Sequence, residues 1–402
     1  MNARILTAEA GATVAGRLGT YLAADDAAAF ATVAGVAIVV VDDAPSGARS
    51  VAQLIVRCGG VAAVAGSRVI IAAGDAALAR AAQEALGPTR TILREVVRAV
   101  ASGRQPATHL RLRGRSVDLA ERPRVMGILN VTPDSFFDGG HYAGIDRARA
   151  RAGELAALGA DIIDIGGQSY ADGSGRVSEA DERARVVPVV EALVCDGLDV
   201  AFSIDTSKSG VAEAALAAGA HLINDCSGLM DARMADVVAR YDAALVVMHI
   251  KGELGVRQAS YHYDDAMAEI LDFLRDRLDR ARAAGVAPES LVCDPGLEFG
   301  KDLATDLEIL ARFGDLASLG VPALLAASRK SFIGRVFASA ASDLLVPSLA
   351  TAAAGIMAGA SLVRAHDVAE TVQVATMLAA LRTHNRARLG VSDATLRTTV
   401  PA

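Results

Sequence analysis

Eight short apolar runs, separated by helical stretches rich in Ala, Leu, Glu and Arg, constrain the fold of this chain more than any other feature. The runs lie at residues 125–129, 161–165, 200–204, 221–223, 243–248, 290–293, 321–327 and 361–363. Unbroken apolar runs of this length are typical of strands buried on both faces of a parallel sheet. Eight strand–helix units over roughly 260 residues match the size of a (β/α)₈ barrel. We therefore predict an α/β fold whose main part, residues 121–402, is a TIM barrel.

The competing parallel α/β fold is a doubly wound open sheet. Such a sheet usually has fewer strands and a glycine-rich first turn, but neither GxGxxG nor a Walker loop occurs in this chain. Several of the helical stretches begin with a capping signal, such as Ser178 followed three residues later by Asp181. The barrel therefore fits the repeat pattern better.

The sequence pattern of residues 1–120 predicts a separate, smaller α/β domain that precedes the barrel in the sequence. Strands are expected at residues 36–41 and 68–72, and helices at residues 51–56, 76–86 and 90–101. Residues 109–119 alternate enough to form a strand or hairpin that leads into the barrel. Because no group of chemically reactive side chains stands out, we expect a scaffolding or oligomer-contact role.

Charge and cysteine content exclude several classes of function. The 402-residue chain has a formal net charge of −7, which argues against non-specific nucleic-acid binding. Its four cysteines are far apart and form no CxxC pair, so neither a zinc site nor a disulfide framework is indicated. No basic segment followed by an apolar one opens the chain, and no apolar run approaches about eighteen residues. We expect a cytoplasmic protein with reduced thiols and no membrane partner.

Polar and glycine residues gather at the carboxyl ends of the predicted strands, where barrel enzymes place their chemistry. The segment after the first strand reads NVTPDSFFDGG, with Asn130 at the strand end and Phe136 on a polar loop. The other strand ends carry Gly166–Ser169, Asp205–Ser207, Asn224-Asp225, Met248-His249, Asp294–Gly296, Ser328–Lys330 and Arg364–His366. A single residue of this kind could be a helix cap or a satisfied buried group. Eight sets on one rim indicate an active site.

Three of these strand ends supply hydrogen-bond acceptors. Asp205, Asn224 and Asp294 carry carboxylate and amide oxygens, and buried carboxylates need partners. A flat heterocycle with an NH/NH₂ edge provides such partners. Taken alone, Asp205 or Asp294 could equally be a helix N-cap. Together they predict a pocket for a polar ring.

The last two strands supply cationic groups. Lys330 and Arg364 follow strands seven and eight, and His366 lies two residues further along the chain. Beside Asn130, these groups suit an anion such as phosphate. Lys330 alone could be a surface ammonium group at the start of a helix. As a group, these residues predict a cationic subsite beside the ring pocket.

The motifs of the barrel segment resemble those of dihydropteroate synthase. They are, in chain order, NVTPDSF with DGG, IDIGG, SIDTS, AGAHLINDCSG, VMHIKG, DPGLEFGK, SRKSFIG and VRAHDV. They cover about residues 124–381 in the order and spacing of the family. The resemblance implies a transferase that condenses 6-hydroxymethyl-7,8-dihydropterin pyrophosphate with p-aminobenzoate, or a related arylamine, in folate biosynthesis. It also implies Mg²⁺ as a cofactor and a homodimer.

The resemblance implies roles for individual residues as well. The pterin-binding set is Asp205, Asn224, Met248, Asp294, Lys330 and Arg364. The catalytic set is Asn130, Lys330, Arg364 and His366, of which Asn130, Arg364 and His366 hold the pyrophosphate and Asn130 also binds Mg²⁺. Phe136 and Ser328 are expected near the arylamine. Pyrophosphate departs, a cation develops at the pterin methylene and the neutral arylamine captures it, so electrostatic stabilisation is needed rather than a general base.

One loop departs from the family pattern. After the second strand the family usually reads GGESTRPG, whereas this chain reads GGQSYADG, with Tyr170, Ala171 and Asp172 in place of Thr, Arg and Pro. A cation is lost and a carboxylate is gained beside an anionic leaving group, which at close range disfavours pyrophosphate by on the order of 1 kcal/mol. Glu298 stands where the family usually has Gly, which predicts a further carboxylate near the pterin side.

Three functions therefore remain open. The first is a synthase that uses p-aminobenzoate or another arylamine, such as a ribosylated aminobenzene. The second is a pterin-binding protein without synthase activity, which the altered loop favours. The third, a pterin-dependent methyltransferase, shares the barrel but is disfavoured, because NVTPDSF and SRKSFIG serve an arylamine and an anion in synthases. A corrinoid-binding His motif is also absent from the sequence.

Overall fold

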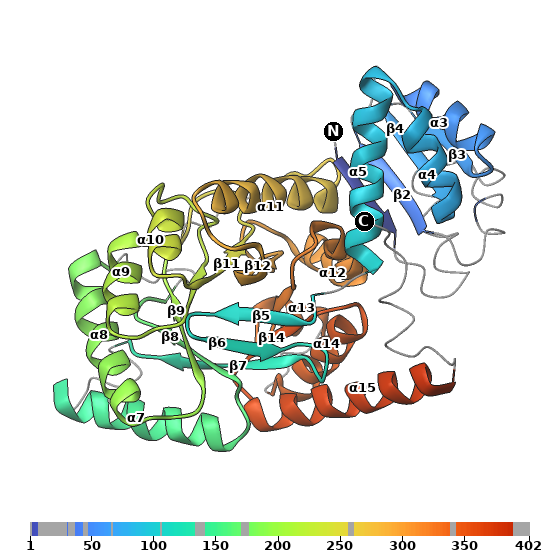
Figure 1. Ribbon diagram of the computed structural model, residues 1–402. Coiled ribbons are helices and arrows are strands. Elements are labelled where there is room, and N and C mark those ends of the chain that lie inside the picture. Colours follow the sequence, from blue (N-terminus) through green and yellow to red (C-terminus); the bar gives the residue numbers. More distant parts are fainter. Residues whose placement is uncertain are drawn as a thin grey trace. The chain divides into compact units, whose positions relative to one another are not determined.

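The computed structural model describes residues 2–6, 30, 37–42, 47–65, 67–104, 107–132, 141–169, 177–255, 261–337 and 343–388 (Figure 1). The chain divides into two compact units. The first comprises Met1–Pro106 with Gly314–Gly320, and the second comprises Ala107–Phe313 with Val321–Ala402. Within the described ranges, no helix is long and apolar enough to cross a membrane.

The N-terminal unit is built on a four-stranded antiparallel sheet. Its strands are β1 (Asn2–Leu6), β2 (Ala37–Asp42), β3 (Val61–Ala65) and β4 (Arg68–Ala73), in the order β1-β2-β4-β3. Its helices are α3 (Ala48–Arg57), α4 (Asp75–Glu84) and α5 (Gly87–Arg104). Apolar side chains of these helices, such as Ile55 and Leu93, share one core with Val39 and Ile71 of the sheet.

Sequence analysis found most but not all of these elements. The strands and helices that it predicted here are confirmed as β2, β4, α3, α4 and α5. It missed β1 and β3. The five residues of β3, VAAVA, lie at the edge of the sheet and are only partly buried, so they lack the alternation that marks a half-buried strand. The role of residues 1–120 stays a prediction.

Eight parallel strands form the barrel that the apolar runs predicted. They are β7 (Arg124–Asn130), β8 (Ile162–Gly166), β9 (Ala201–Asp205), β10 (Leu222–Asp225), β11 (Ala244–Met248), β12 (Leu291–Asp294), β13 (Leu324–Ala326) and β14 (Leu362–Ala365). Seven successive pairings run from β12 through β7 to β14 and β13. A parallel bridge between Cys293 and Ala323 joins the two edges, with Cys293 N donating to Pro322 O at 2.9 Å. The sheet is therefore a nearly closed barrel.

Helices connect the barrel strands. They are α7 (His141–Ala157), α8 (Glu179–Cys195), α9 (Ser209–Ala217), α10 (Met234–Arg240), α11 (Ala266–Ala283), α12 (Leu303–Ala311), α13 (Ser331–Val336), α14 (Leu345–Met357) and α15 (Val368–Arg388), with short 3₁₀ helices at Pro288–Ser290 and Phe313–Leu319. The predicted cap of α8 is confirmed, because Ser178 Oγ accepts a hydrogen bond from Asp181 N at 3.1 Å. A helix thus lies in each connection between successive parallel strands, as crossover connections usually require.

A hairpin packs against the amino-terminal end of the barrel. It consists of β5 (His109–Leu112) and β6 (Arg115–Asp118), which join through Gly114 at a φ of +67°. Leu110 and Leu112 are buried in one cluster with the first residues of the barrel strands, including Met126 and Leu222. The hairpin thus belongs to the barrel unit and fills the end opposite the carboxyl ends of the strands.

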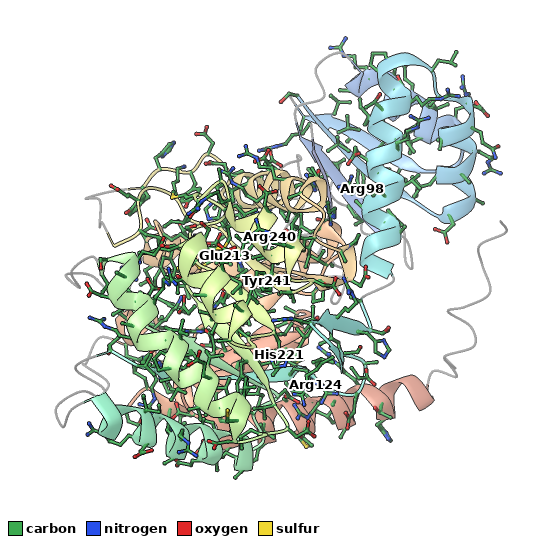
Figure 2. The ribbon with its side chains drawn as sticks, turned by 60° about the vertical axis from the view of Figure 1, so that its left-hand side comes forward. Arg98, Arg124, Glu213, His221, Arg240 and Tyr241 are labelled. Atoms are coloured by element: carbon green, nitrogen blue, oxygen red, sulfur yellow. The ribbon has the colours of Figure 1, made fainter. Side chains whose placement is uncertain are left out.

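Figure 2 labels an ion pair between outer helices of the barrel and a half-buried histidine that directly precedes β10. Arg240 Nη1 donates to Glu213 Oε1 at 2.6 Å between α10 and α9, but both side chains are largely exposed, so this pair stabilises little. His221 Nδ1 accepts a hydrogen bond from Phe202 N at 3.1 Å. Burial, assisted by the charges of Arg115 and Arg113, lowers the pKa of His221 to about 4. His221 is therefore a neutral structural residue.

Replacing Leu112 by Ala tests the packing of the hairpin. Leu112→Ala removes a buried side chain from the barrel core, so urea unfolding should show a loss of about 2–5 kcal/mol. The half-exposed Leu158 provides the control, and Leu158→Ala should cost less than about 1 kcal/mol. Equal effects of the two changes would show that the hairpin contributes nothing to the core.

Candidate active site

The strand register brings predicted site residues together at the carboxyl end of the barrel. Asn130 on β7 lies opposite Gly166 on β8, and Gly166 lies opposite Asp205 on β9. Asp205 lies opposite Asn224 on β10. A Cβ atom on Gly166 would lie 3.3 Å from Asn130 Oδ1 and 3.8 Å from Asp205 Cβ. The absence of a side chain at Gly166 therefore leaves room for its two neighbours.

Asp164, in the middle of β8, joins three other strands through hydrogen bonds. Its carboxylate is fully buried, and Oδ1 accepts from Ser203 Oγ at 2.5 Å. Oδ2 accepts from Asn224 Nδ2 at 3.0 Å and from Arg364 Nε at 2.6 Å. Sequence analysis gave Asp164 no role. The signal that could have found it is a lone carboxylate inside the apolar strand Ile162–Gly166, because a buried charge needs a partner.

Arg364 bridges Asp164 and a second carboxylate, that of Asp205. While Nε donates to Asp164, Nη2 donates to Asp205 Oδ2 at 2.9 Å. Burial raises the pKa of Asp205 to about 7, although the positive charge of Arg364 acts in the opposite direction. Burial also opposes the charge on Arg364, but the two carboxylates outweigh it and raise the pKa of the guanidinium. Arg364 is therefore a fixed positive charge between two acids.

The loop after β12 links Asp294 to Lys330. Asp294 is buried, and its Oδ1 accepts a hydrogen bond from Gly296 N at 2.7 Å. Lys330 Nζ donates to Leu297 O at 2.7 Å and lies 4.9 Å from the centre of the Phe299 ring. Burial raises the pKa of Asp294, and the charge of Lys330 opposes this effect. The loop after β12 thus contacts both Asp294 and Lys330, and the two groups interact electrostatically.

Met248 lies in a small apolar cluster beside these polar groups. Its side chain is buried with Cys226 and Ile250, and Leu254 and Phe299 pack against the cluster. Met248 pairs with Asp294 across β11 and β12. This position fits the predicted role of Met248 in lining the floor of a ring pocket.

Asn130, Ser328 and His366 lie on a more exposed part of the rim. Ser328 Oγ accepts a hydrogen bond from His366 N at 3.1 Å, which joins the ends of β13 and β14. Asn130 and His366 are exposed. Partial burial, with the charge of Arg364, lowers the pKa of His366. Its imidazole is therefore neutral at pH 7, and the positive charge of the site comes from Lys330 and Arg364.

Phe136 and the altered loop cannot be placed in the site. Phe136, predicted near the arylamine, lies outside the described residues. So do Tyr170, Ala171 and Asp172. The roles predicted for this loop and for Phe136 therefore stay predictions.

Glu298 bonds to the start of α13, directly after Lys330, so the expectation of an added carboxylate near the pterin side stays a prediction. Its backbone has a φ of +70°, a left-handed conformation that favours glycine. Its Oε1 accepts from Ser331 Oγ at 2.6 Å and from Phe332 N at 2.6 Å, at the start of α13. These bonds at a helix N-terminus offset the cost of a side chain at this position.

Lys301 and His249 form a buried pair that the sequence did not reveal. Lys301 Nζ lies 2.9 Å from His249 Nδ1 and donates to Phe299 O at 2.9 Å. Burial lowers the pKa of Lys301 to about 7, and burial together with the charge of Lys301 lowers the pKa of His249. His249 N also donates to Asp294 O at 2.8 Å. The pair therefore supports the segment that carries Asp294 and its loop.

A further ion pair lies at the end of β8. Lys208 Nζ donates to Gln168 Oε1 at 2.6 Å and to the buried carboxylate of Glu182. Arg185 Nη1 donates to Gly167 O at 2.9 Å. These contacts hold the residues that lead into the altered loop.

The arrangement defines a class of protein: a TIM-barrel enzyme whose strand ends bring buried acceptors together with two cations. Asp205, Asn224 and Asp294 are the acceptors, and Lys330 and Arg364 are the cations. Acceptors suit the N–H edge of a polar ring, and the cations suit a negatively charged group.

Comparison with known proteins agrees with this class. A family model described as pterin binding enzyme matches residues 126–366. Dihydropteroate synthase of Escherichia coli (strain K12) is 40% identical over 260 residues, which cover 65% of this chain and 92% of the relative. The Bacillus subtilis (strain 168) dihydropteroate synthase is 40% identical over 262 residues, which cover 65% of this chain and 89% of the relative.

Solved structures give the same result. The Yersinia pestis dihydropteroate synthase with a sulfonamide drug is 42% identical, with a TM-score of 0.64 and coverage of 68% of this chain and 99% of that chain. The Xanthomonas albilineans dihydropteroate synthase in complex with 7,8-dihydropteroate is 40% identical, with a TM-score of 0.60 and coverage of 68% and 98%. This chain therefore belongs to the dihydropteroate synthase family of pterin binding enzymes, which are transferases.

Gly296→Ala tests whether the loop after β12 shapes the site. A Cβ atom here would lie 1.9 Å from His249 O, so the loop must move and pterin affinity should fall at least tenfold. Gly114 has the same φ of +67° with open space around it, so Gly114→Ala should cost only about 1 kcal/mol of backbone strain. Calorimetric titration with 6-hydroxymethylpterin measures both variants. Unchanged affinity of Gly296→Ala would rule out this loop as part of the site.

Lys301→Met tests the buried lysine through stability. Between pH 7 and pH 10 the unfolded chain keeps a proton on Lys301 that the folded chain has lost, so stability should rise with pH. This one group adds on the order of 1 kcal/mol per pH unit to the slope of the unfolding free energy. Lys301→Met should remove that contribution between pH 7.5 and 9.5. The control Lys251→Met should keep it, and identical slopes for wild type and Lys301→Met would contradict the assignment.

Proposed function

We propose that this protein is a dihydropteroate synthase that condenses 6-hydroxymethyl-7,8-dihydropterin pyrophosphate with p-aminobenzoate or a related arylamine. The observation that carries the proposal is the set of buried acceptors at the ends of β9, β10 and β12, together with Lys330 after β13 and Arg364 on β14. This set occurs in a chain that is 40% identical to dihydropteroate synthases over almost their whole length. The TIM-barrel site and the family membership point to the same ligand.

Three acceptors would bind the N–H edge of the pterin. Asp205 Oδ1 is buried and accepts no hydrogen bond from a nitrogen or oxygen donor in the described part of the chain. Asp294 and Asn224 face the same mouth from β12 and β10, and Met248 offers an apolar surface beneath. Ring N–H groups that donate to these buried acceptors would contribute to both affinity and specificity.

Lys330 and Arg364 would serve the opposite side of the ligand. Lys330 donates to the ring, and the guanidinium plane of Arg364 stacks on it while its charge faces the pyrophosphate. Asn130 and His366, on the exposed rim, would hold the phosphate oxygens with N–H donors. Ser328, bonded to His366 N, would lie near the arylamine.

The residues at this mouth fit Mg²⁺ as a cofactor held mainly by the substrate. Among the described residues, no group of three or more His, Cys, Asp or Glu side chains could hold a metal ion. Asn130 offers one exposed amide oxygen, and Mg²⁺ usually combines one or two protein oxygens with substrate phosphates and water. When bound, the ion would neutralise charge on the departing pyrophosphate.

The reaction needs positioning and charge more than proton transfer. The bond between the pterin methylene and the pyrophosphate oxygen breaks, a C–N bond to the arylamine forms, and the amine nitrogen loses a proton. Positive charge at the methylene develops near Asp205 and Asp294, while Arg364 and Lys330 stabilise the leaving anion. Because these groups are fixed by the protein before the substrate arrives, little reorganisation is required in the transition state.

The altered loop supports a second candidate, a pterin-binding protein without synthase activity. Where the family usually has Thr-Arg-Pro, this chain has Tyr170, Ala171 and Asp172. The loss of a cation there weakens the case for pyrophosphate and p-aminobenzoate binding but leaves the ring pocket unchanged. The same substitutions also allow a third outcome, a synthase that uses a related arylamine.

Assembly and location complete the proposal. We propose a homodimer formed through α14 and α15, because Val346, Met357 and Met377 expose 60–73% of their surface on these helices. We also propose a cytoplasmic protein that acts on small molecules and binds neither membranes nor nucleic acid. The four cysteines are free, which agrees with a reducing compartment.

A turnover assay tests the proposed activity. Purified protein with the pterin pyrophosphate, p-aminobenzoate and Mg²⁺ should release pyrophosphate and form dihydropteroate, and Lys330→Ala should reduce kcat/KM at least a hundredfold. Leu158→Ala serves as the matched surface control. Pterin binding without turnover would favour the second candidate, and turnover only with a ribosylated arylamine would change the substrate.

The pH dependence of pterin binding tests Asp205. Its carboxylate must be unprotonated to accept a ring N–H, and burial raises its pKa to about 7. Affinity for 6-hydroxymethylpterin should therefore fall as the pH drops from 8 to 5, by up to about tenfold per unit below pH 7. Asp205→Asn should bind weakly and lose this dependence. A wild-type affinity that stays constant over this range would contradict the role of Asp205.

A further inference from the structure

Asp164 bonds both to Asn224, an acceptor of the proposed ring pocket, and to the cation Arg364. Its side chain is fully buried below the rim, so it does not itself reach a ligand. Oδ2 accepts hydrogen bonds from Asn224 Nδ2 at 3.0 Å and Arg364 Nε at 2.6 Å, and Oδ1 accepts from Ser203 Oγ at 2.5 Å. Three neighbours on three strands are thus oriented by one carboxylate.

The contact with Asn224 determines which end of its amide faces the mouth. A carboxylate paired with a guanidinium can only accept hydrogen bonds, so the NH₂ group of Asn224 must turn toward Asp164. The carbonyl oxygen of Asn224 then lies at the opposite end of the amide group. The reversed amide would place that oxygen against an acceptor and leave it without a donor at this contact.

We propose that Asp164 is a positioning residue that sets the hydrogen-bond polarity of the ring pocket. By turning the carbonyl oxygen of Asn224 toward the ligand, it makes the wall formed by Asp205, Asn224 and Asp294 a wall of acceptors only. Such a wall selects a ring that carries an amino group over the same ring with a carbonyl group at that position. This inference rests on the proposed function, because it assumes that the wall binds a pterin edge.

The hydrogen bond between Asp164 and Arg364 also helps to keep the carbonyl oxygen of Asn224 available to the ligand. With Nε held by Asp164 and Nη2 by Asp205, the guanidinium cannot swing toward Asn224 and offer it a donor. The same hydrogen bonds hold the positive charge against Asp164 and Asp205. Asp164 therefore fixes both the amide of Asn224 and the guanidinium of Arg364.

Two ring probes and four proteins test the proposal. The probes are 6-hydroxymethylpterin and 6-hydroxymethyllumazine, which has an oxygen where pterin has its 2-amino group. Calorimetric titration gives the ratio of the two dissociation constants for the wild type, Asp164→Ala, Asp164→Asn and the control Ser203→Ala. The wild type should prefer pterin at least a hundredfold, since the 2-carbonyl group of lumazine leaves the acceptor that faces this position without a donor.

The variants separate orientation from structural support. Asp164→Ala frees the amide of Asn224 to turn, so the preference should fall below tenfold as pterin binds more weakly and lumazine more tightly. Asp164→Asn should stay within threefold of the wild-type ratio. Its amide oxygen can still accept from Asn224, while the Ser203 hydroxyl reverses to accept from the new NH₂ group. Ser203→Ala should also keep the ratio, because Asn224 and Arg364 retain their acceptor.

Two results would overturn the proposal. A wild type without preference between the probes would show that the wall is not made of acceptors only. A ratio unchanged in Asp164→Ala, with both ligands weakened equally, would show that Asp164 is only a structural support. If Asp164→Ala does not fold by circular dichroism, Asp164→Ser is measured in the same way. The turnover assay is independent of this test. A protein that condenses the substrates but does not discriminate between the probes would contradict this inference alone. A protein that discriminates between the probes but shows no turnover would contradict the proposed synthase activity.

Discussion

A guanidinium shared by two buried carboxylates is the interaction on which the mouth of this barrel depends. Arg364 pairs with Asp164 and Asp205, and without it β8 and β9 would each bury a negative charge close to the other. Removing one partner from such an arrangement leaves an uncompensated charge, which is far more costly than never having built the pair. The cation thus permits a concentration of acids that would otherwise repel one another. A ligand with ring N–H groups meets these acids already in place.

In the loop after β12, the backbone lies in close contact with the neighbouring segment. Gly296 has a φ of +67° and lies against His249 O, which brings the loop after β12 under Lys330. Glu298 holds a similar left-handed conformation with a side chain, and its hydrogen bonds to the start of α13 offset that strain. The side chain at this position therefore contributes to the start of α13.

The sequence predicted the barrel well because buried parallel strands leave unbroken apolar runs, and the polar residue that ends each run marks the rim. It could not predict Asp164, whose role arises from partners up to 200 positions away along the chain, at Arg364. It missed β3 because a short, alanine-rich edge strand has no alternation to detect. Its expectation that Glu298 lies on the pterin side stays a prediction, because sequence identity carries no information on the direction of a side chain. Phe136 and Tyr170 lie outside the described residues, so their predicted roles are unchanged.

The most direct measurement is a crystal structure of the protein with 6-hydroxymethylpterin and pyrophosphate bound. We expect the ring edge within hydrogen-bond distance of Asp205, Asn224 and Asp294, with Lys330 on its other side and Arg364 still bonded to Asp164. A pterin bound elsewhere on the molecule, or a mouth in which Arg364 has left Asp164 to make room for the ring, would contradict this account.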